Sequence, residues 1–299
     1  MSNLIIYTSE YLRTTPETSC IAQALDTALG NLQIKHGELK NTNDYWCRDY
    51  MPIRLFDDGS AYATYTFNPD YLKDYKSKRP YITDQQEACK ELDIHTPSHL
   101  RINFEGGNYV RCGNKVVMTD KIFMENPHWP IPDLFCHLRD NLCGEIVLLP
   151  WDMKDPCGHA DGMVAPLDDG RLLLSNCWRT QDRAFHRRLL KILEPHFEIV
   201  ELSLKPEKYT WAYLNFLRVP GAILLPCLSE TTDCENDQEA IALFHKLFPE
   251  DEIVPIYALP LIKRGGALHC VTWELVMHEP LGQGDNHYKS KKVFKFKEV

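Results

Sequence analysis

Short apolar runs alternate along this chain with amphipathic stretches of helical period. Residues Leu4–Thr8 predict a strand, and residues 15–30 predict a helix that opens with a cap and a proline and ends at a glycine. Within that helix Ile21, Leu25 and Leu29 fall on one face, as expected when a helix packs against a core.

The same alternation continues along the chain to residue 256. Further strands are predicted at Leu100–Phe104, Lys115–Thr119, Glu145–Leu149, Ala222–Leu225 and Glu252–Ile256. Further helices are predicted at Thr83–Leu92, where Thr83 opens a capping-box pattern, Ile131–Leu142, Thr180–Leu193 and Asn236–Phe248, with Asn236 as its cap. Strand–helix alternation at intervals of about 50 residues indicates an α/β fold of similar units. Periodicity alone leaves open a doubly wound sheet or a ring of small sheets.

Composition adds little to this picture. The chain has 299 residues, of which 44% are hydrophobic and 25% charged, as in ordinary globular proteins. We expect one domain over residues 1–299. No apolar run reaches the roughly 18–20 residues of a membrane-spanning helix, and no basic region precedes the first apolar run as in a signal peptide. A cytoplasmic protein without a membrane partner is therefore expected.

Charge and cysteine content exclude several classes of function. The net charge is −9, and lysines and arginines form no long block, so nucleic acid is not an expected partner. The 11 cysteines show neither the even pairing of a disulfide scaffold nor the tight spacing of a structural zinc site. Most of them are expected to be reduced thiols packed as small hydrophobic side chains.

Four short segments combine ionisable residues with glycines and aromatic residues. The first holds Trp46, Arg48 and Asp49. Asp49 could form a structural ion pair with Arg48, or face a pocket in which a flat cation is held by the carboxylate and the indole ring. In the second, Glu105 precedes two glycines and Asn108. This segment is either a plain turn or a tight backbone that brings a carboxylate close to a site.

The third segment contains His159 and Asp161. On an extended strand they would point to the same side, which suits acid–base chemistry or half of a metal site. A surface turn is the alternative. In the fourth segment a glycine pair precedes His269 and Cys270. Cysteine is the most nucleophilic common side chain near neutral pH, and a cationic neighbour lowers its pKa.

In this order and spacing, the four segments resemble the guanidine-modifying enzyme superfamily. They are most similar to its agmatine deiminase and bacterial peptidyl-arginine deiminase branch. That branch carries Trp-x-Arg-Asp-x-Gly-Pro, Glu-Gly-Gly-Asn, Gly-His-x-Asp and Gly-x-x-His-Cys. The corresponding segments here are Trp46–Pro52, Glu105–Asn108, Gly158–Asp161 and Gly266–Cys270, and Tyr213–Phe216 also resembles the branch.

The resemblance implies a five-bladed, pseudo-symmetric α/β propeller with the site at its centre. It implies a small cationic guanidine as the partner, and neither a metal nor an organic cofactor. A zinc site made by His159, Asp161 and Cys270 is the alternative, although a thiolate among carboxylates is an unusual zinc ligand set. The resemblance leaves a homo-oligomer open.

The implied reaction converts a guanidine to a ureido product and ammonia. Cys270 would be the nucleophile and His159 the acid and base, with Glu105 orienting and charging His159. Asp49 and Asp161 would grip the planar guanidinium through paired, charge-assisted hydrogen bonds. The substrate-binding residues implied by the resemblance are Trp46, Asp49, Asp161 and Asn108.

Several departures from the branch leave the substrate open. Met51 stands where a glycine is usual, and Arg264 and Ala267 stand where agmatine deiminases typically have Gly and Asn. The usual Trp-Glu-Pro opening is also missing. Agmatine, free arginine, a peptide-terminal arginine and other alkylguanidines all remain candidates. An amidinotransferase and a guanidine-binding protein without turnover are the alternative functions.

Overall fold

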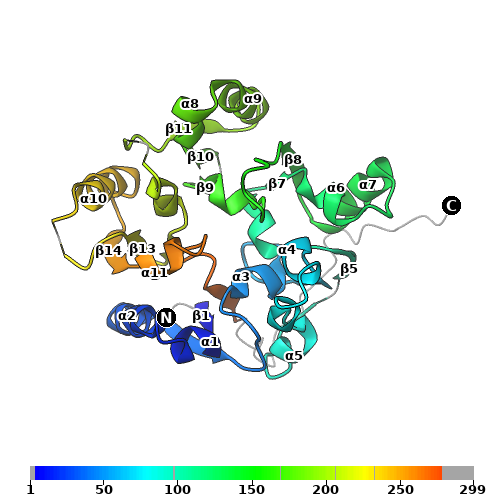
Figure 1. The fold of residues 1–299 in the computed structure, drawn as a ribbon, viewed down its shortest axis with the longest axis horizontal. Coiled ribbons are helices and arrows are strands. Elements are labelled where there is room, and N and C mark those ends of the chain that lie inside the picture. The colour runs from blue at the N-terminus through cyan, green and yellow to red at the C-terminus, as the bar shows by residue number, and fades with distance from the viewer. Residues whose placement is uncertain (1–3, 97, 169, 206, 232, 278–299) are drawn as a thin grey trace, which may run out of the picture.

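The computed structural model describes residues 4–96, 98–168, 170–205, 207–231 and 233–277. These residues form five three-stranded sheets set in a ring around a common centre, with helices at the periphery (Figure 1). In each sheet the middle strand pairs antiparallel with one neighbour and parallel with the other. The predicted five-bladed α/β propeller is thereby confirmed.

The elements are numbered along the chain. The strands are β1 (Leu4–Ser9), β2 (Lys35–Leu39), β3 (Ile53–Arg54), β4 (Tyr62–Thr66), β5 (Ser98–Asn103), β6 (Val110–Cys112), β7 (Lys115–Thr119), β8 (Glu145–Leu149), β9 (Val164–Pro166), β10 (Arg171–Leu174), β11 (Glu198–Glu201), β12 (Leu217–Val219), β13 (Ala222–Cys227), β14 (Glu252–Tyr257) and β15 (Trp273–Val276). The α-helices are α1 (Glu10–Thr14), α2 (Ser19–Asn31), α3 (Cys47–Tyr50), α4 (Asp70–Lys73), α5 (Gln85–Cys89), α6 (Lys121–Glu125), α7 (Ile131–Asn141), α8 (Cys177–Gln181), α9 (Arg183–Leu193), α10 (Glu235–Leu247) and α11 (Leu259–Ile262). The short 3₁₀ helices are η1 (Arg79–Tyr81), η2 (Gly106–Asn108), η3 (Ala160–Gly162) and η4 (Thr210–Leu214).

Each blade follows one plan, β–β–helix–β, in which the helix carries the chain between two parallel strands. A parallel pair requires such a crossover, and the crossover helix buries one apolar face against its sheet. In α2 the predicted face of Ile21, Leu25 and Leu29 is buried. The repeat at about 50-residue intervals is therefore the repeat of the blade.

The first predicted helix begins later than its capping pattern indicated. Residues 10–14 form the separate helix α1, whose N-cap Ser9 accepts a hydrogen bond from the backbone of Tyr11. The next helix begins only at Ser19, because the Thr18 hydroxyl donates to the carbonyl of Leu12 and ties the intervening turn to α1.

Three further helix boundaries differ from prediction, two of them because a different side chain caps the helix. Asp84, and not Thr83, caps α5 by accepting two backbone hydrogen bonds. Asp182 interrupts the predicted helix over residues 180–193 and caps α9. In α10, Asn236 does not act as the cap; its side chain donates to Glu207, and the helix begins at Glu235.

The ring is closed by the two ends of the described chain. Strand β15 pairs antiparallel with β1, so that Tyr7 lies opposite Trp273. The Trp273 ring packs 5.9 Å from the ring of Tyr7 and 5.7 Å from that of Tyr62, between two blades. The two ends of the described chain are therefore joined by a cluster of three aromatic rings, of which Trp273 and Tyr62 are buried.

Each connection between blades carries one of the segments singled out in the sequence. The helices α3, η2, η3 and η4 lie immediately before the first strands of four blades, and the segment after α11 lies before β15. Neighbouring connections contact one another, from α3 to η2, from η2 to η3 and from η3 to η4. The pseudo-symmetry thus brings distant segments to the centre of the ring.

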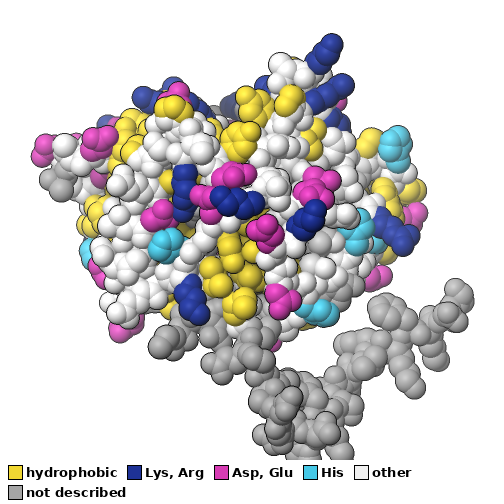
Figure 2. Space-filling view, turned by 90° about the horizontal axis from the view of Figure 1, so that it is seen from below, with side chains coloured by type: hydrophobic (Ala, Val, Ile, Leu, Met, Phe, Trp, Pro, Cys, Tyr) yellow, Lys and Arg dark blue, Asp and Glu magenta, His cyan; other side chains and the backbone are white. Residues whose placement is uncertain are grey.

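The surface agrees with the scattered charges of the sequence. On the face in Figure 2, acidic and basic side chains lie next to one another around a central apolar area. Within the described ranges, no helix is long and apolar enough to span a bilayer. All 11 cysteines are free thiols.

Candidate active site

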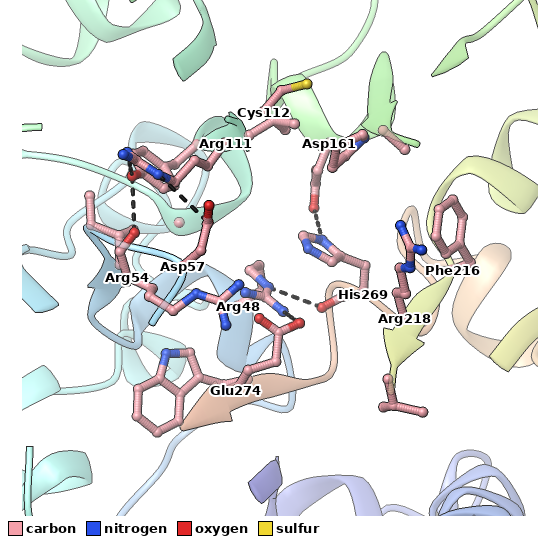
Figure 3. Close-up of a pocket in the computed structure, with 18 of the residues that line it drawn as sticks. Arg48, Arg54, Asp57, Arg111, Cys112, Asp161, Phe216, Arg218, His269 and Glu274 are labelled. Carbon is pink, nitrogen blue, oxygen red and sulfur yellow. Dashed lines mark hydrogen bonds and ion pairs between the residues drawn. The ribbon is translucent and has the colours of Figure 1, made fainter. Parts of the chain in front are cut away.

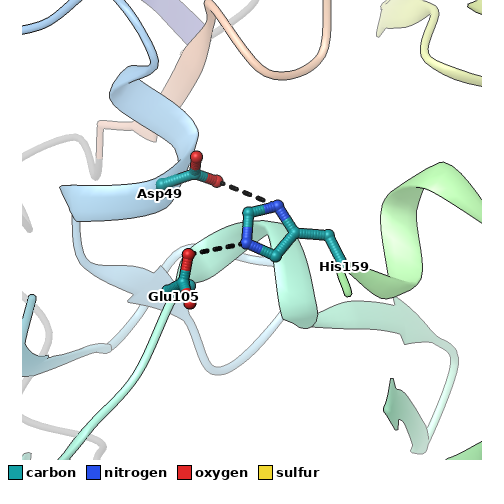
Figure 4. Close-up of side chains that lie close together, drawn as sticks. All are labelled: Asp49, Glu105 and His159. Carbon is teal, nitrogen blue, oxygen red and sulfur yellow. Dashed lines mark hydrogen bonds and ion pairs between the residues drawn. The ribbon is translucent and has the colours of Figure 1, made fainter. Parts of the chain in front are cut away.

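His159 lies between two carboxylates near the centre of the ring (Figure 4). Its Nε2 donates to Glu105 Oε2 at 2.8 Å, and its Nδ1 lies 3.6 Å from Asp49 Oδ1. Burial alone would lower the pKa of His159, but Asp49 and Glu105 outweigh it and raise this pKa to about 10. His159 is therefore an imidazolium at neutral pH and can donate a proton.

The glycine pair of the second segment is required by this close approach. A Cβ at Gly107 would lie 2.4 Å from Nδ1 of His159 and 2.7 Å from Oδ1 of Asp49. No side chain fits in that space. Of the two readings of this segment, the close backbone approach to a site is the one that the geometry supports.

Glu105 is held by more groups than its motif suggested. Tyr71 donates its hydroxyl to Oε2 of Glu105 at 2.6 Å, and Nζ of Lys121 lies 3.6 Å from Oε1. Burial favours the neutral acid, but His159 and then Lys121 outweigh it and keep the pKa of Glu105 below its ordinary value. Sequence reasoning missed Tyr71 and Lys121, since neither belongs to a recognisable motif.

Lys121 is expected to be essential for stability. Its Nζ lies 2.9 Å from Glu125 and 3.2 Å from Asp70, as well as near Glu105. Lys121→Met leaves these carboxylates close together without their cation. It should lower the free energy of unfolding by about 3 kcal/mol, measured by urea denaturation at neutral pH. The exposed Lys191→Met is the control, and equal losses in both variants would contradict the assignment.

Cys270 is buried at the end of the fourth segment. Its backbone N–H and that of Ala267 both donate to Oδ1 of Asn215, at 3.2 and 3.0 Å. Its Sγ lies 3.7 Å from Oδ2 of Asp161. Burial, followed by Asp161 and Asp49, raises the pKa of the Cys270 thiol well above its ordinary value. A cation bound beside it would act in the opposite direction and favour the thiolate.

Asn215 explains one departure from the related motifs. Ala267 was expected to remove a polar group from the nucleophile loop, but Asn215 supplies a carbonyl oxygen to that loop from the neighbouring blade. A second departure, Met51, lies in the interior. Met51 is fully buried, and its carbonyl accepts a hydrogen bond from Tyr65.

Two pockets meet this central cluster. The front pocket has a volume of about 650 Å³. The predicted site residues that line it are Trp46, Asp49, His159 and Cys270. The rear pocket has a volume of about 470 Å³ and is shown in Figure 3. Its lining includes Arg48, Met51, Asp161, His269 and Glu274. The two pockets share no lining residue. Arg48 and His269 line the rear pocket, whereas the residues that follow them, Asp49 and Cys270, line the front pocket. The connections between blades therefore form the wall that separates the two pockets.

The third segment does not have its predicted geometry. It was expected to be extended, with His159 and Asp161 on one side. Instead His159 is the N-cap of η3, and the tight turn sends the two side chains to different pockets. Asp161 belongs to the wall, where Oδ2 is still within reach of Cys270.

Asn108 is not among the residues that line the front pocket, although it was expected to bind substrate. Its Oδ1 accepts a hydrogen bond from the backbone N–H of Thr119 at 2.8 Å, and its Nδ2 donates to the carbonyl of the same residue at 3.4 Å. This pair ties η2 to β7. In this geometry Asn108 holds the connection that carries Glu105.

Trp46 packs against the nucleophile loop, as a wall of the front pocket. A Cβ at Gly266 would lie 2.3 Å from Cζ3 of Trp46 and 3.1 Å from Cβ of Cys270. A glycine at this position therefore allows the indole ring and the cysteine to share one face of the pocket.

Arg48 and Asp49 do not form the structural ion pair that was the alternative for the first segment. Nη2 of Arg48 lies 3.1 Å from Glu274. Asp49 Oδ1 is buried and accepts no hydrogen bond from any residue in the described ranges. Burial raises the pKa of Asp49 to about 7, with His159 opposing and Glu105 reinforcing the shift.

A metal ion could in principle meet Asp49, Glu105 and His159, whose ligand atoms lie within 4.8 Å of one another. This set differs from the zinc ligands considered from the sequence, of which only His159 is shared. Both ring nitrogens of His159 face carboxylates, and a doubly protonated imidazole has no lone pair for a metal. The donor chemistry fits an ion triad better than a metal site.

Comparisons with known proteins identify the family to which this chain belongs. The family described as Porphyromonas-type peptidyl-arginine deiminase matches residues 13–275. An agmatine deiminase of Pseudomonas aeruginosa is 25% identical over 277 residues, which cover 78% of this chain and 74% of that protein.

Solved structures share the fold at lower identity. A variant of the C. jejuni agmatine deiminase with substrate bound is 17% identical and has a TM-score of 0.68, covering 92% of this chain and 93% of that one. The agmatine deiminase of Enterococcus faecalis is 17% identical with a TM-score of 0.66, covering 91% and 93%. These likenesses establish the propeller independently of the motifs.

Proposed function

Since the chain belongs to the Porphyromonas-type peptidyl-arginine deiminase family, we propose that it is a cysteine-dependent deiminase. It hydrolyses a guanidine to the ureido product and ammonia. Cys270 is the nucleophile, His159 the acid and base, and Asp49 and Asp161 the carboxylates that hold the guanidinium.

One observation carries this proposal above all. Asp49 Oδ1 is a buried acceptor without a hydrogen bond among the described residues, in the pocket that also exposes Cys270. Oδ1 lies 3.6 Å from Nδ1 of His159 but accepts no hydrogen bond among the described residues. Buried polar atoms are almost always hydrogen-bonded, so this oxygen requires a further donor. A guanidinium supplies it, because its N–H groups donate in one plane to carboxylates on either side.

The chemistry follows from the charges of the site. The bound cation lowers the pKa of Cys270, whose proton is released, and the thiolate attacks the guanidinium carbon. The imidazolium of His159 gives its proton to the departing nitrogen, and ammonia leaves. The remaining thiouronium is attacked by water, from which the now neutral His159 takes a proton. Collapse of the adduct forms the C=O bond and breaks the C–S bond; the sulfur of Cys270 leaves and takes up the hydroxyl proton, and the ureido product is released.

The deciding experiment is to measure ammonia and ureido product from a panel of guanidines. The panel contains agmatine, arginine, peptides ending in arginine and simple alkylguanidines. Turnover of at least one of them is expected. A new guanidine formed only when an acceptor amine is added would indicate an amidinotransferase instead. A ligand that raises the melting temperature but is never consumed would indicate binding without turnover.

The outer part of the front pocket indicates which guanidines are preferred. Arg264 and Lys78 line it together with Asp44. Burial raises the pKa of Asp44 to about 7, so its charge is incomplete at neutral pH. Arg264 is partly exposed and lies 3.8 Å from its nearest carboxylate, that of Glu17. The two cations thus favour a substrate with a carboxylate at its far end, such as arginine.

Arg264→Ala should therefore change selectivity. We expect kcat/KM for arginine, or for a peptide ending in arginine, to fall about tenfold, which corresponds to about 1.4 kcal/mol. An alkylguanidine without a carboxylate should be unaffected. The measurement is steady-state kinetics on both substrates, with the exposed Arg188→Ala as a matched control. A loss shared equally by the two substrates would show that Arg264 does not contact the carboxylate.

A further inference from the structure

His269 precedes the nucleophile but faces the rear pocket (Figure 3). Its Nδ1 donates to Oδ2 of Asp161 at 2.8 Å. The His269 side chain retains 26% of its exposure and that of Asp161 only 6%. The buried carboxylate of Asp161 thus accepts a hydrogen bond from His269, whose side chain lines the rear pocket.

This contact is the strongest that Asp161 makes among the described residues. Nδ2 of Asn215 lies 3.5 Å from the same Oδ2 atom, and Sγ of Cys270 lies 3.7 Å from it. A hydrogen bond at 2.8 Å is of ordinary strength, whereas the other two are at the outer limit. The orientation of the carboxylate therefore depends on His269.

His269 is itself held rigidly. Its N–H donates to the carbonyl of Asn215 at 3.1 Å, and its own carbonyl accepts from Nε of Arg48 at 3.3 Å. Arg48 is fixed in turn by Glu274 at 3.1 Å. The charged groups that act on Asp161 are His269, His159, Arg48 and Asp49, and Glu274 acts on His269. The Cys270 thiol also faces Asp161. Two neighbouring connections therefore fix the backbone from which the imidazole projects.

We propose that His269 is a positioning residue of the deiminase reaction. From the rear pocket it holds the Asp161 carboxylate ionised and fixes it beside Cys270, where it accepts from the guanidinium. The inference rests on the proposed function and adds to it a residue that touches neither substrate nor the reacting atoms.

The surroundings of Asp161 make such support necessary. Burial raises the pKa of this carboxyl, but the hydrogen bond from His269 is the first of several contributions that reverse the shift and hold the pKa below its ordinary value. Without that donor, a buried carboxylate next to a thiol is expected to take up a proton or to rotate. In either case it would lose its in-plane contact with the substrate.

The test compares two substitutions of similar size. His269→Asn keeps an N–H at the position of Nδ1, and His269→Leu removes it. We expect kcat/KM on the best substrate to fall on the order of 100-fold in the leucine variant, and the asparagine variant to recover at least tenfold of this loss. The acid limb of the pH profile should move upward by about one unit or more in the leucine variant only, because Asp161 must be ionised to bind the cation.

Two further measurements separate this proposal from its alternatives. Melting temperatures show whether a variant is merely unfolded, and His269→Phe replaces His269→Leu if the latter does not fold. Binding of an alkylguanidine, measured by thermal shift, tests whether His269 supports Asp161 without requiring turnover. If the wild-type protein turns over no guanidine, only the proposed function is overturned, and this binding test still applies. Equal behaviour of the asparagine and leucine variants, or an unchanged acid limb, would overturn the role of His269.

Discussion

Replacement of Cys270 by alanine is expected to abolish turnover of every guanidine in the panel, by on the order of 10⁴-fold or more. Cys157 also lines the front pocket, but among the described residues of that pocket only Cys270 has a thiol within 4 Å of Asp161. Hydrolysis without the thiol would require direct attack of water on a delocalised cation, which is a poor electrophile. The measurement is ammonia release at saturating substrate.

The control for this variant is another buried free cysteine. Cys227 in β13 is 4% exposed, compared with 8% for Cys270, and it does not line the front pocket. Cys227→Ala should retain activity, whereas Cys270→Ala should lose activity while it still binds an alkylguanidine. Ammonia release that survives in Cys270→Ala would refute the covalent mechanism.

The second large effect is expected at His159. His159→Gln keeps a hydrogen bond to Glu105 but cannot carry a proton to the leaving nitrogen, so kcat should fall on the order of 10³-fold. Binding of an alkylguanidine should be kept, because Asp49 and Asp161 remain. A variant that loses binding and keeps kcat would show that His159 holds the substrate and does not transfer protons.

The pH profile gives an independent measure of the same residue. The pKa of His159 is raised to about 10, so the proton needed for departure of ammonia is present at neutral pH and lost only as pH rises through that value. We expect kcat/KM of the wild-type protein to fall on this alkaline side. In Glu105→Gln one of the two carboxylates that stabilise the imidazolium is gone, so the alkaline limb should move to lower pH.

Sequence periodicity predicted the units of this fold but not their arrangement. The helix α7 and the strands β7 and β8 lie where the apolar pattern placed them. Whether the units form one sheet or a ring depends on the pairing of β1 with β15. These two strands are separated by almost the whole described chain. Such a pairing has no local signature. The ring was predicted from the resemblance of motifs and not from periodicity.

Site residues could be predicted where the residue type itself defines the chemistry. They could not be predicted where the three-dimensional position of the side chain determines its role. Asp49, His159 and Cys270 share one pocket, as the motifs indicated. Asp161 faces the other pocket because a single 3₁₀ turn separates it from its neighbour, and local sequence does not reveal such a turn. Lys121 reaches Glu105 only because two blades meet, and a lone lysine after a strand carries no signal.

Closure of the ring also follows the order in which the site residues are synthesised. Cys270 stands three residues before Trp273, the first residue of β15, whereas the residues that surround its thiol come from connections made much earlier in synthesis. The carboxylates and the imidazolium are therefore synthesised before the thiol that completes the site. The thiol enters this environment with the strand that completes the last blade. The site is thus complete only when β15 has paired with β1.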